Sequence, residues 1–263
     1  MRRTESMDWQ RDLTGLFIGF VLATITTPVG VSGAVFLLPV QLSLLHVPSP
    51  RVTPTNLLYN VISGPGGLAR YRRRAQLDRE LTLQLVGGSV PGVILGALLR
   101  IYVAADPDVF RLLAAAVLAP VGLFILRNPR AGSLGRRLRP RTVSTLAFAI
   151  GIVGGIYGIG GGSVLGPILV GTGMAVATVA PAALFSTWTT SLVGVATYAI
   201  VSLQAPGPVS PDWSLGIATG LGGLAGGWLG ASLQPRIPER ALRRLLGVLA
   251  LSLACVYVIQ SIA

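Results

Sequence analysis

A glycine cluster opens the second half of this 263-residue chain: residues 154–163 read Gly154-Gly-Ile-Tyr-Gly-Ile-Gly-Gly-Gly-Ser163, and Pro167 follows. Glycine frees the backbone for conformations that a Cβ opposes. Such a cluster also exposes amide N–H groups at the start of the following helix, where the helix dipole favours an anion. The stretch therefore predicts an anion-binding helix start. The alternative is that the glycines only allow helices to pack closely.

The first half of the chain contains a degenerate copy of this stretch. Gly30-Val-Ser-Gly-Ala-Val-Phe-Leu-Leu-Pro39 aligns with Gly158-Ile-Gly-Gly-Gly-Ser-Val-Leu-Gly-Pro167. Further along, residues 92–97 align with residues 226–231, and residues 107–111 align with residues 238–243, with one residue inserted. The matches keep their order along the chain, which indicates an internal duplication.

The composition is that of a protein whose surface faces lipid. Hydrophobic residues make up 52% of the chain and charged residues only 11%, and the mean hydropathy is +0.71. A soluble domain usually carries about 25% charged residues. The net charge of +12 comes from arginines in short runs between apolar segments, as the positive-inside rule expects of a membrane protein. This distribution favours a lipid bilayer, and not nucleic acid, as the partner of the basic residues.

Ten apolar segments can be drawn, five in each half, named a to e. They cover 13–27, 31–46, 53–69, 81–102 and 107–126 in the first half, and 143–157, 161–176, 181–203, 213–233 and 240–262 in the second. Segments c, d and e approach the ~20 residues that a spanning helix needs, whereas a and b are shorter and are interrupted by glycine or proline. The predicted organisation is a polar N-terminal segment (1–12), a first membrane repeat (13–127), a basic cytoplasmic linker (128–142) and a second membrane repeat (143–263).

Equivalent loops of the two halves carry opposite patterns of arginine. The first c–d loop contains the run Arg70-Tyr-Arg-Arg-Arg74 and Arg79, whereas residues 203–212 contain no basic residue. The d–e loops show the reverse, with Arg236, Arg240, Arg243 and Arg244 in the second half and balanced charges in the first. Short basic loops stay cytoplasmic, so the two repeats are predicted to be inverted.

Inversion requires each repeat to cross the bilayer an odd number of times. Segments c, d and e supply three crossings, so a and b together must supply two or none. They are therefore predicted to form a hairpin, either of two thin spans or of a re-entrant loop. The fold class predicted is an all-α integral membrane protein of two inverted repeats, multi-pass in the cell (inner or plasma) membrane, with both termini on the non-cytoplasmic side.

Small and polar residues at the starts of the b segments and along the c segments form the predicted substrate site. Its members are Gly158, Gly160, Gly161, Gly162, Ser163, Ser32, Gly33, Asn56, Asn60, Thr187 and Trp188. Amides, hydroxyls and the indole N–H can donate hydrogen bonds to an anion, and Asn56 and Asn60 share a helix face because they lie one turn apart. The alternatives are hydroxyls that bond to their own helix and polar groups that only join helices together.

The sequence offers no constellation for catalysis. No Asp or Glu falls inside an apolar segment, and the chain has one histidine, His46, and one cysteine, Cys255. A carboxylate relay, a metal site and a nucleophilic triad are therefore not expected, and no Walker motif is present. The prediction is a protein that is no enzyme and has no cofactor. His46 is read as an interfacial residue, with a proton-linked gate as the alternative.

The motif Gly-x-x-Gly-Ile-Gly-Gly-Gly-(x)4-Pro, from Gly155 to Pro167, together with the inverted duplication, resembles the sulfite exporter TauE/SafE family. The resemblance covers the chain from about Gly15 to its end, and the first-half copy departs from it at Ser32 and Ala34. It implies a secondary transporter, an exporter of a small anion such as sulfite or an organosulfonate. We expect it to work by alternating access, and both a monomer and a homo-oligomer remain open. An anion channel and a non-transporting membrane scaffold remain the alternatives.

Overall fold

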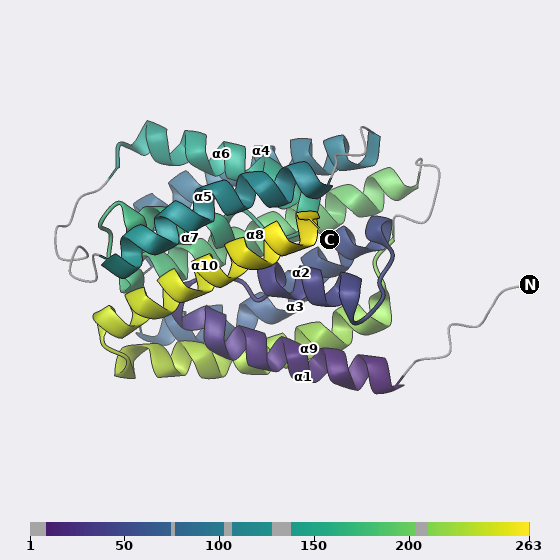
Figure 1. The fold of residues 1–263 in the computed structure, drawn as a ribbon, viewed down its shortest axis with the longest axis horizontal. Helices are drawn as coiled ribbons and strands as arrows, with labels where there is room; N and C mark the ends of the chain where they lie inside the picture. The colour runs from purple at the N-terminus through teal and green to yellow at the C-terminus, as the bar shows by residue number, and fades with distance from the viewer. Residues whose placement is uncertain (1–8, 75–76, 103–106, 128–137, 204–209, 263) are drawn as a thin grey trace, which may run out of the picture.

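The computed structural model describes residues 9–74, 77–102, 107–127, 138–203 and 210–262. Within these ranges the protein has ten α-helices and no β-strand (Figure 1). The helices of the first half are α1 (Trp9–Thr26), α2 (Ala34–Ser43), α3 (Ser49–Arg74), α4 (Arg79–Tyr102) and α5 (Pro107–Arg127). Those of the second half are α6 (Pro140–Tyr157), α7 (Gly162–Gly171), α8 (Val176–Ser202), α9 (Trp213–Leu233) and α10 (Glu239–Ile262).

The short helices α2 and α7 each follow a tight turn at a glycine. Gly30 ends the 3-10 turn η1 (Thr27–Val29) with φ 73°, and Gly158 ends α6 with φ 72°. A positive φ of this size is routine only for glycine, which explains why both halves keep this residue. Each short helix has ten residues, which corresponds to ~15 Å. That is about half the thickness of a bilayer core, so each is a half-helix.

Several predicted boundaries move in the structure. The run from Arg70 to Arg74 was predicted as a loop, but it forms the last turns of α3, and three arginines assigned to the second d–e loop lie in the first turns of α10. Arginine is a good helix former, and its long side chain can reach outward from the end of a helix. Helix α1 begins within the predicted polar segment 1–12, and α6 begins within the predicted linker. Residues 1–8 and 128–137 of those two segments lie outside the described residues.

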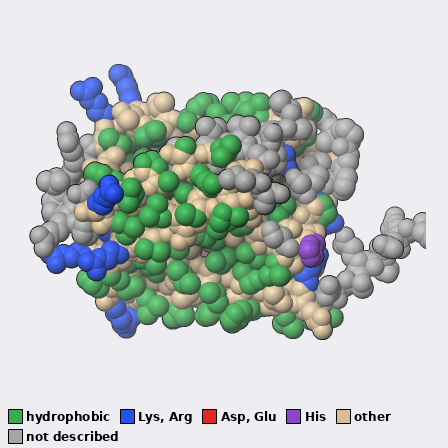
Figure 2. All heavy atoms as spheres, viewed as in Figure 1, with side chains coloured by type: hydrophobic (Ala, Val, Ile, Leu, Met, Phe, Trp, Pro, Cys, Tyr) green, Lys and Arg blue, Asp and Glu red, His purple; other side chains and the backbone are tan. Residues whose placement is uncertain are grey.

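Four of the described helices are long and apolar enough to cross a membrane. They are Trp9–Val29, which joins α1 to η1, Arg79–Tyr102, Val176–Ser202 and Glu239–Ser261. Figure 2 shows hydrophobic side chains over the middle of the visible face and most of its basic side chains toward the left-hand end, where α5 ends and α10 begins. The protein is thus an all-α, multi-pass membrane protein. Which end faces the cytoplasm, and with it the side of the termini, stays a prediction.

Helices of the two halves pack against each other in a reciprocal pattern. Helix α1 packs against α9 and α6 against α4, while α3 packs against α9 and α8 against α4. Two further pairs, α3 with α8 and α5 with α10, join corresponding helices of the two halves. Replacing every helix by its counterpart reproduces the same set of pairs. Two related halves that interlock would give this pattern, whereas their inverted orientation in the membrane stays a prediction.

Candidate functional site

The half-helices α2 and α7 pack against the long helices α3 and α8 of their own halves, while the glycine turns that precede them each contact the long helix of the other half (Figure 1). A Cβ added at Gly30 would lie 2.3 Å from Ala180 Cα in α8. A Cβ added at Gly158 would lie 2.3 Å from the Thr53 carbonyl oxygen in α3. Only glycine permits such close contact, so the glycine turns bring the starts of α2 and α7 together between α3 and α8.

Ser32 and Ser163 meet where the two half-helices begin. The Ser32 backbone N–H donates to Ser163 Oγ at 3.4 Å, and the Ser32 hydroxyl donates to Asn60 Oδ1. The Ser163 hydroxyl donates to the Ile159 carbonyl of the preceding turn at 2.9 Å. The Ser163 hydroxyl therefore bonds to its own segment, whereas the Ser32 hydroxyl bonds to a side chain of α3.

Asn56 and Asn60 lie on the face of α3 that contacts the start of α2. Asn56 Nδ2 donates to the Ala34 carbonyl at 2.9 Å. Both side chains are buried, with relative exposures of 0% and 2%. In the described part of the chain, Asn56 Oδ1 and Asn60 Nδ2 have no hydrogen-bond partner. A buried polar atom of this kind calls for a partner, and Asn60 Nδ2 is a donor.

The second half surrounds the same point with backbone amides and hydroxyls. The Gly161 N–H donates to Thr190 Oγ1 at 3.2 Å, and Thr187 Oγ1 lies 3.5 Å from Ser163 Oγ. Gly33 precedes α2 as Gly161 precedes α7, and neither caps its helix with a side chain. The first amides of a helix have no partner within it, so these amides are available to a ligand or a neighbouring group.

Trp188 is not part of the polar cluster, which consists of Ser32, Asn56, Asn60, Gly161, Ser163 and Thr187. Its indole N–H donates to the Val61 carbonyl of α3 at 3.2 Å, and its ring is only partly buried. Consecutive residues of a helix point about 100° apart, because a turn takes 3.6 residues. Thr187 therefore faces the half-helices while Trp188 faces along the contact between α3 and α8. In this conformation the indole is a structural donor and is not available to a substrate.

Three further residues border the cluster and were not selected from the sequence. Ser89 of α4 lies beside Gly161, since a Cβ there would be 2.6 Å from Ser89 Oγ. Thr190 accepts the Gly161 amide, and Ser191 Oγ, 3.2 Å from a Cβ added at Gly160, has no partner in the described part of the chain. Thr190 and Ser191 belong to the polar run of segment c. For Ser89, the only feature of the sequence that could indicate a place beside the cluster is the pair of small residues before it, Gly87 and Gly88.

The cluster presents neutral hydrogen-bond donors and no charged side chain. A full charge at this depth would be costly, whereas amides at a helix start attract anions without one. Among the described residues, no three His, Cys, Asp or Glu side chains gather as a metal site would require. His46 lies apart, exposed and with φ 49°, in the connection between α2 and α3.

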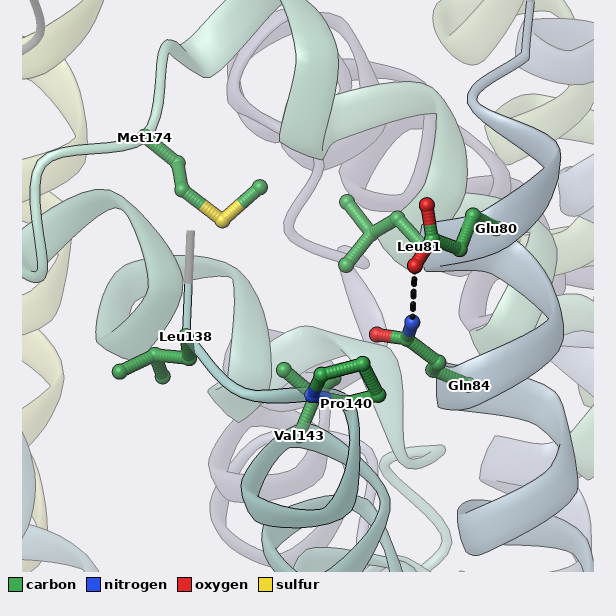
Figure 3. A pocket seen from close by; sticks show the side chains of 7 residues that line it. All are labelled: Glu80, Leu81, Gln84, Leu138, Pro140, Val143 and Met174. Carbon is green, nitrogen blue, oxygen red and sulfur yellow. Dashed lines mark hydrogen bonds between the residues drawn. The ribbon is translucent and has the colours of Figure 1, made fainter. Parts of the chain in front are cut away.

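A separate cavity of about 120 Å³ lies between the starts of α4 and α6 and the turn between α7 and α8 (Figure 3). Figure 3 shows Glu80 and Gln84 of α4 on one side of it and Leu138, Pro140 and Val143 on another, with Met174 above. None of these residues belongs to the polar cluster. The cavity borders the far end of α7 and not its start.

Known proteins that resemble this chain are membrane transporters. The family model described as sulfite exporter TauE/SafE matches residues 15–257. The probable membrane transporter protein YunE of Bacillus subtilis is 23% identical over 93% of this chain and 96% of its own length. The probable membrane transporter protein YjnA of Bacillus subtilis is 28% identical, over 88% and 92%. A probable membrane transporter protein of Xylella fastidiosa is 25% identical, over 94% and 92%.

No solved structure matches the chain. The family match nevertheless covers all ten helices at least in part, including both half-helices and every residue of the polar cluster. The relatives named above are called probable membrane transporter proteins and not enzymes. With an all-α fold, several membrane-spanning helices and this match, the chain belongs to the TauE/SafE family of membrane transporters.

Proposed function

We propose that this protein exports a small sulfur oxyanion, sulfite or an organosulfonate, across the cell membrane by alternating access. The family description supports the substrate class. The polar cluster supports an anion, because it combines uncapped helix-start amides with neutral side-chain donors. The substrate would lie between the starts of α2 and α7.

The observation that carries the proposal is the unpaired amide of Asn60. Its Nδ2 donor is buried and has no partner in the described part of the chain. Leaving a buried donor unsatisfied costs ~1–3 kcal/mol. An anion bound beside it would accept this hydrogen bond and remove that cost.

The geometry of the donors suits a group with several oxygens. Sulfite and sulfonates share a head with three oxygens that diverge from one sulfur. Donors are available from three directions: Asn60 from α3, the first amides of α7, and the hydroxyls of α8 around Thr187. A head group placed among them can accept from each helix at once, which a single helix start could not achieve.

The helix packing suggests which parts move. Contacts of α1 with α9 and of α4 with α6 bring backbones together: a Cβ at Gly222 would lie 1.9 Å from the Leu16 carbonyl, and one at Gly96 would lie 2.0 Å from the Ile152 carbonyl. Such pairs have no room to slide, and each joins helices of different halves. The rocking bodies are therefore α1, α2, α3 and α9 on one side and α6, α7, α8 and α4 on the other. They meet along α3 and α8, with the glycine turns as the pivot.

The first experiment is radiolabelled sulfite flux into proteoliposomes, with sulfoacetate, sulfate and chloride as competitors. Saturable flux that a sulfonate inhibits supports a carrier of this substrate class. Flux that does not saturate, with large single-channel currents, would favour an anion channel. No flux of any of these anions, with folded protein in the bilayer, would refute the sulfur-anion proposal.

Gly161→Leu tests the position of the site. The added side chain would meet Ser89, whose Oγ lies 2.6 Å from the new Cβ, and would fill the space at the start of α7. We expect transport to be lost while the protein still elutes as a single folded species. Gly87→Leu on α4 is the matched control, because its Cβ would meet no atom within 4 Å. Normal transport by Gly161→Leu would exclude this site.

A further inference from the structure

Arg243 is a fully buried arginine in the first turns of α10, in a helix that is apolar enough to span the membrane. Arginine is almost never fully buried unless its charge is paired. An ionisable residue inside a membrane segment is costly and is generally retained for function. The polar cluster does not include Arg243, so its role needs a separate explanation.

The guanidinium is directed at the C-terminal end of the half-helix α7. Arg243 Nη2 donates to the Val170 carbonyl at 2.9 Å, and Nη1 donates to the Met174 carbonyl at 3.2 Å. The last carbonyls of a helix carry partial negative charge and lack partners within the helix. The Val170 carbonyl also accepts the Gly173 N–H of the following turn at 3.1 Å, so Arg243 adds a charged donor and joins this end of α7 to α10.

Glu239, one turn earlier on α10, extends the same connection to α8. Its Oε1 accepts the Val176 N–H at the start of α8 at 2.8 Å and lies 4.0 Å from Arg243 Nη1. A carboxylate is favourable at a helix start, as a cation is at a helix end. The first turns of α10 thus hold the end of α7 and the start of α8 on both sides of the turn that joins them.

On its other side, that turn borders empty space. Met174, whose carbonyl accepts from Arg243, also lines the cavity of about 120 Å³ in Figure 3. Side-chain packing on this side leaves room for the turn to shift toward α4 and α6. The polar contacts with α10 therefore add to the packing of Leu169 and Val170 in holding the end of α7 on the side away from the cavity.

We propose that Arg243 is a positioning residue for the anion site. Helix α7 is a rod of ~15 Å whose first amides face the polar cluster. When the C-terminal end of α7 is fixed, its N-terminal amides keep their orientation toward the anion. When that end is released, the helix can tilt and its first amides move away from the anion. This inference rests on the proposed function, because it assigns the amides at the start of α7 to substrate binding.

The test compares Arg243→Met with Arg244→Met, its exposed neighbour on the same turn. Both variants lose one positive charge, but only the first loses the contacts with α7. Arg243→Met should raise the KM for sulfite about tenfold, the change expected from one weakened hydrogen bond to a charged group. Arg244→Met should keep the wild-type KM. Arg243→Lys, which keeps the charge but not the two-pronged geometry, should lie between them.

Flux is normalised to folded protein, so that loss of fold and loss of affinity are separated. A purely structural role would lower the amount of folded Arg243→Met protein and leave its KM unchanged, which would overturn the proposal. An increase in KM that Arg243→Lys partly restores would support it.

Hydrogen exchange provides a readout that needs no substrate. In Arg243→Met, the amides of α7 should exchange faster than in the wild type, while those of α2 should not change. Equal acceleration in both half-helices, or none in α7, would contradict positioning by Arg243. If the wild-type protein moves no sulfur anion and α7 still responds selectively, the proposed substrate fails but the connection from Arg243 to α7 stands.

Discussion

The starts of α2 and α7 share a glycine turn, but they differ in side chains and, at one position, in backbone: Gly160 has φ 71°, whereas its counterpart Ser32 has no positive φ. Both follow a glycine of left-handed conformation, Gly30 or Gly158, and both begin after a glycine that provides no side-chain cap. At the start of α2, the Ala34 N–H donates to Ser32 Oγ at 3.1 Å. At the start of α7, Gly160 takes the place of Ser32 and brings no hydroxyl. The first half therefore satisfies the Ala34 amide with its own hydroxyl, whereas the second half has no hydroxyl at the equivalent position to accept the Gly162 amide.

Because of this difference, the two halves contribute different kinds of hydrogen-bond donor to the site. On the α7 side glycine replaces the capping hydroxyl, and the Gly161 N–H donates instead to Thr190 Oγ1 of α8. On the α2 side the free donor is a side chain, Asn60, which the Ser32 hydroxyl holds through its Oδ1 atom. A duplicated fold can thus keep the turn that positions a ligand while one copy binds through its backbone and the other through side chains.

The largest effect is expected at Gly162, the first residue of α7. A Cβ there would lie 1.9 Å from the Ala183 carbonyl of α8, so Gly162→Ala must shift backbone. Its counterpart in the alignment is Ala34, which has a Cβ and is fully buried. A displacement of ~1 Å at a binding site can reduce activity about 100-fold. We expect a loss of this order in sulfite flux for Gly162→Ala.

The reciprocal variant, Ala34→Gly, should remain active. Glycine within a helix costs ~1 kcal/mol relative to alanine, but it introduces no contact. Flux would stay close to the wild type and thermal stability would fall slightly. Equal loss of flux in both variants would mean that close contact with a neighbouring helix does not explain the effect of Gly162→Ala, and that the two half-helix starts are equally sensitive to any change.

A smaller effect is expected from the aligned pair Asn60 and Trp188. Asn60→Ala removes the unpaired donor and should raise the KM for sulfite about tenfold, because a hydrogen bond to a charged group is worth ~1.5–3 kcal/mol. Trp188→Phe removes a hydrogen bond to the Val61 carbonyl and should leave KM unchanged. Both KM values come from the same flux assay. A larger change for Trp188→Phe would place the indole, and not the amide, at the substrate.

Much of this arrangement could be predicted from the sequence. The glycine cluster and its degenerate copy located both turns, and the short segments after them are the half-helices α2 and α7. The polar residues of segment c pointed to Asn56, Asn60 and Thr187, which do gather near the two starts. These features follow from local rules: glycine for positive φ, and a shared face for residues one turn apart.

The remaining features depend on contacts between distant segments, which local rules do not determine. Nothing in hydropathy shows that α1 packs against α9, because lipid-facing helices with small residues can pair with many partners. Ser89 borders the cluster only because α4 packs beside α6 and so lies next to Gly161. The sequence predicts Arg243 as a loop residue, because its burial depends on contacts with the end of α7 that hydropathy does not show. The direction of Trp188 required the helix phase of α8, which an alignment alone does not give.

The smallest effects are expected at two tyrosine hydrogen bonds that the two halves have in common. The Tyr71 hydroxyl of α3 donates to the Thr27 carbonyl at 2.8 Å, and the Tyr198 hydroxyl of α8 donates to the Gly155 carbonyl at 3.0 Å. Thr27 and Gly155 occupy equivalent positions before the two glycine turns, so each tyrosine fixes the hairpin of its own half. Tyr71→Phe and Tyr198→Phe should each lower the free energy of unfolding by ~1 kcal/mol.

Thermal unfolding of the purified protein in detergent measures both losses, with Tyr102→Phe, an exposed position at the end of α4, as the control that should change nothing. Equal losses would mean that the frame of the two hairpins has stayed symmetric although their ligand-facing groups have diverged. A loss in one half alone would show that the frame has diverged as well. The contrast between Gly160 and Ser32 would then extend to the geometry of the whole hairpin, beyond the local backbone difference at this position.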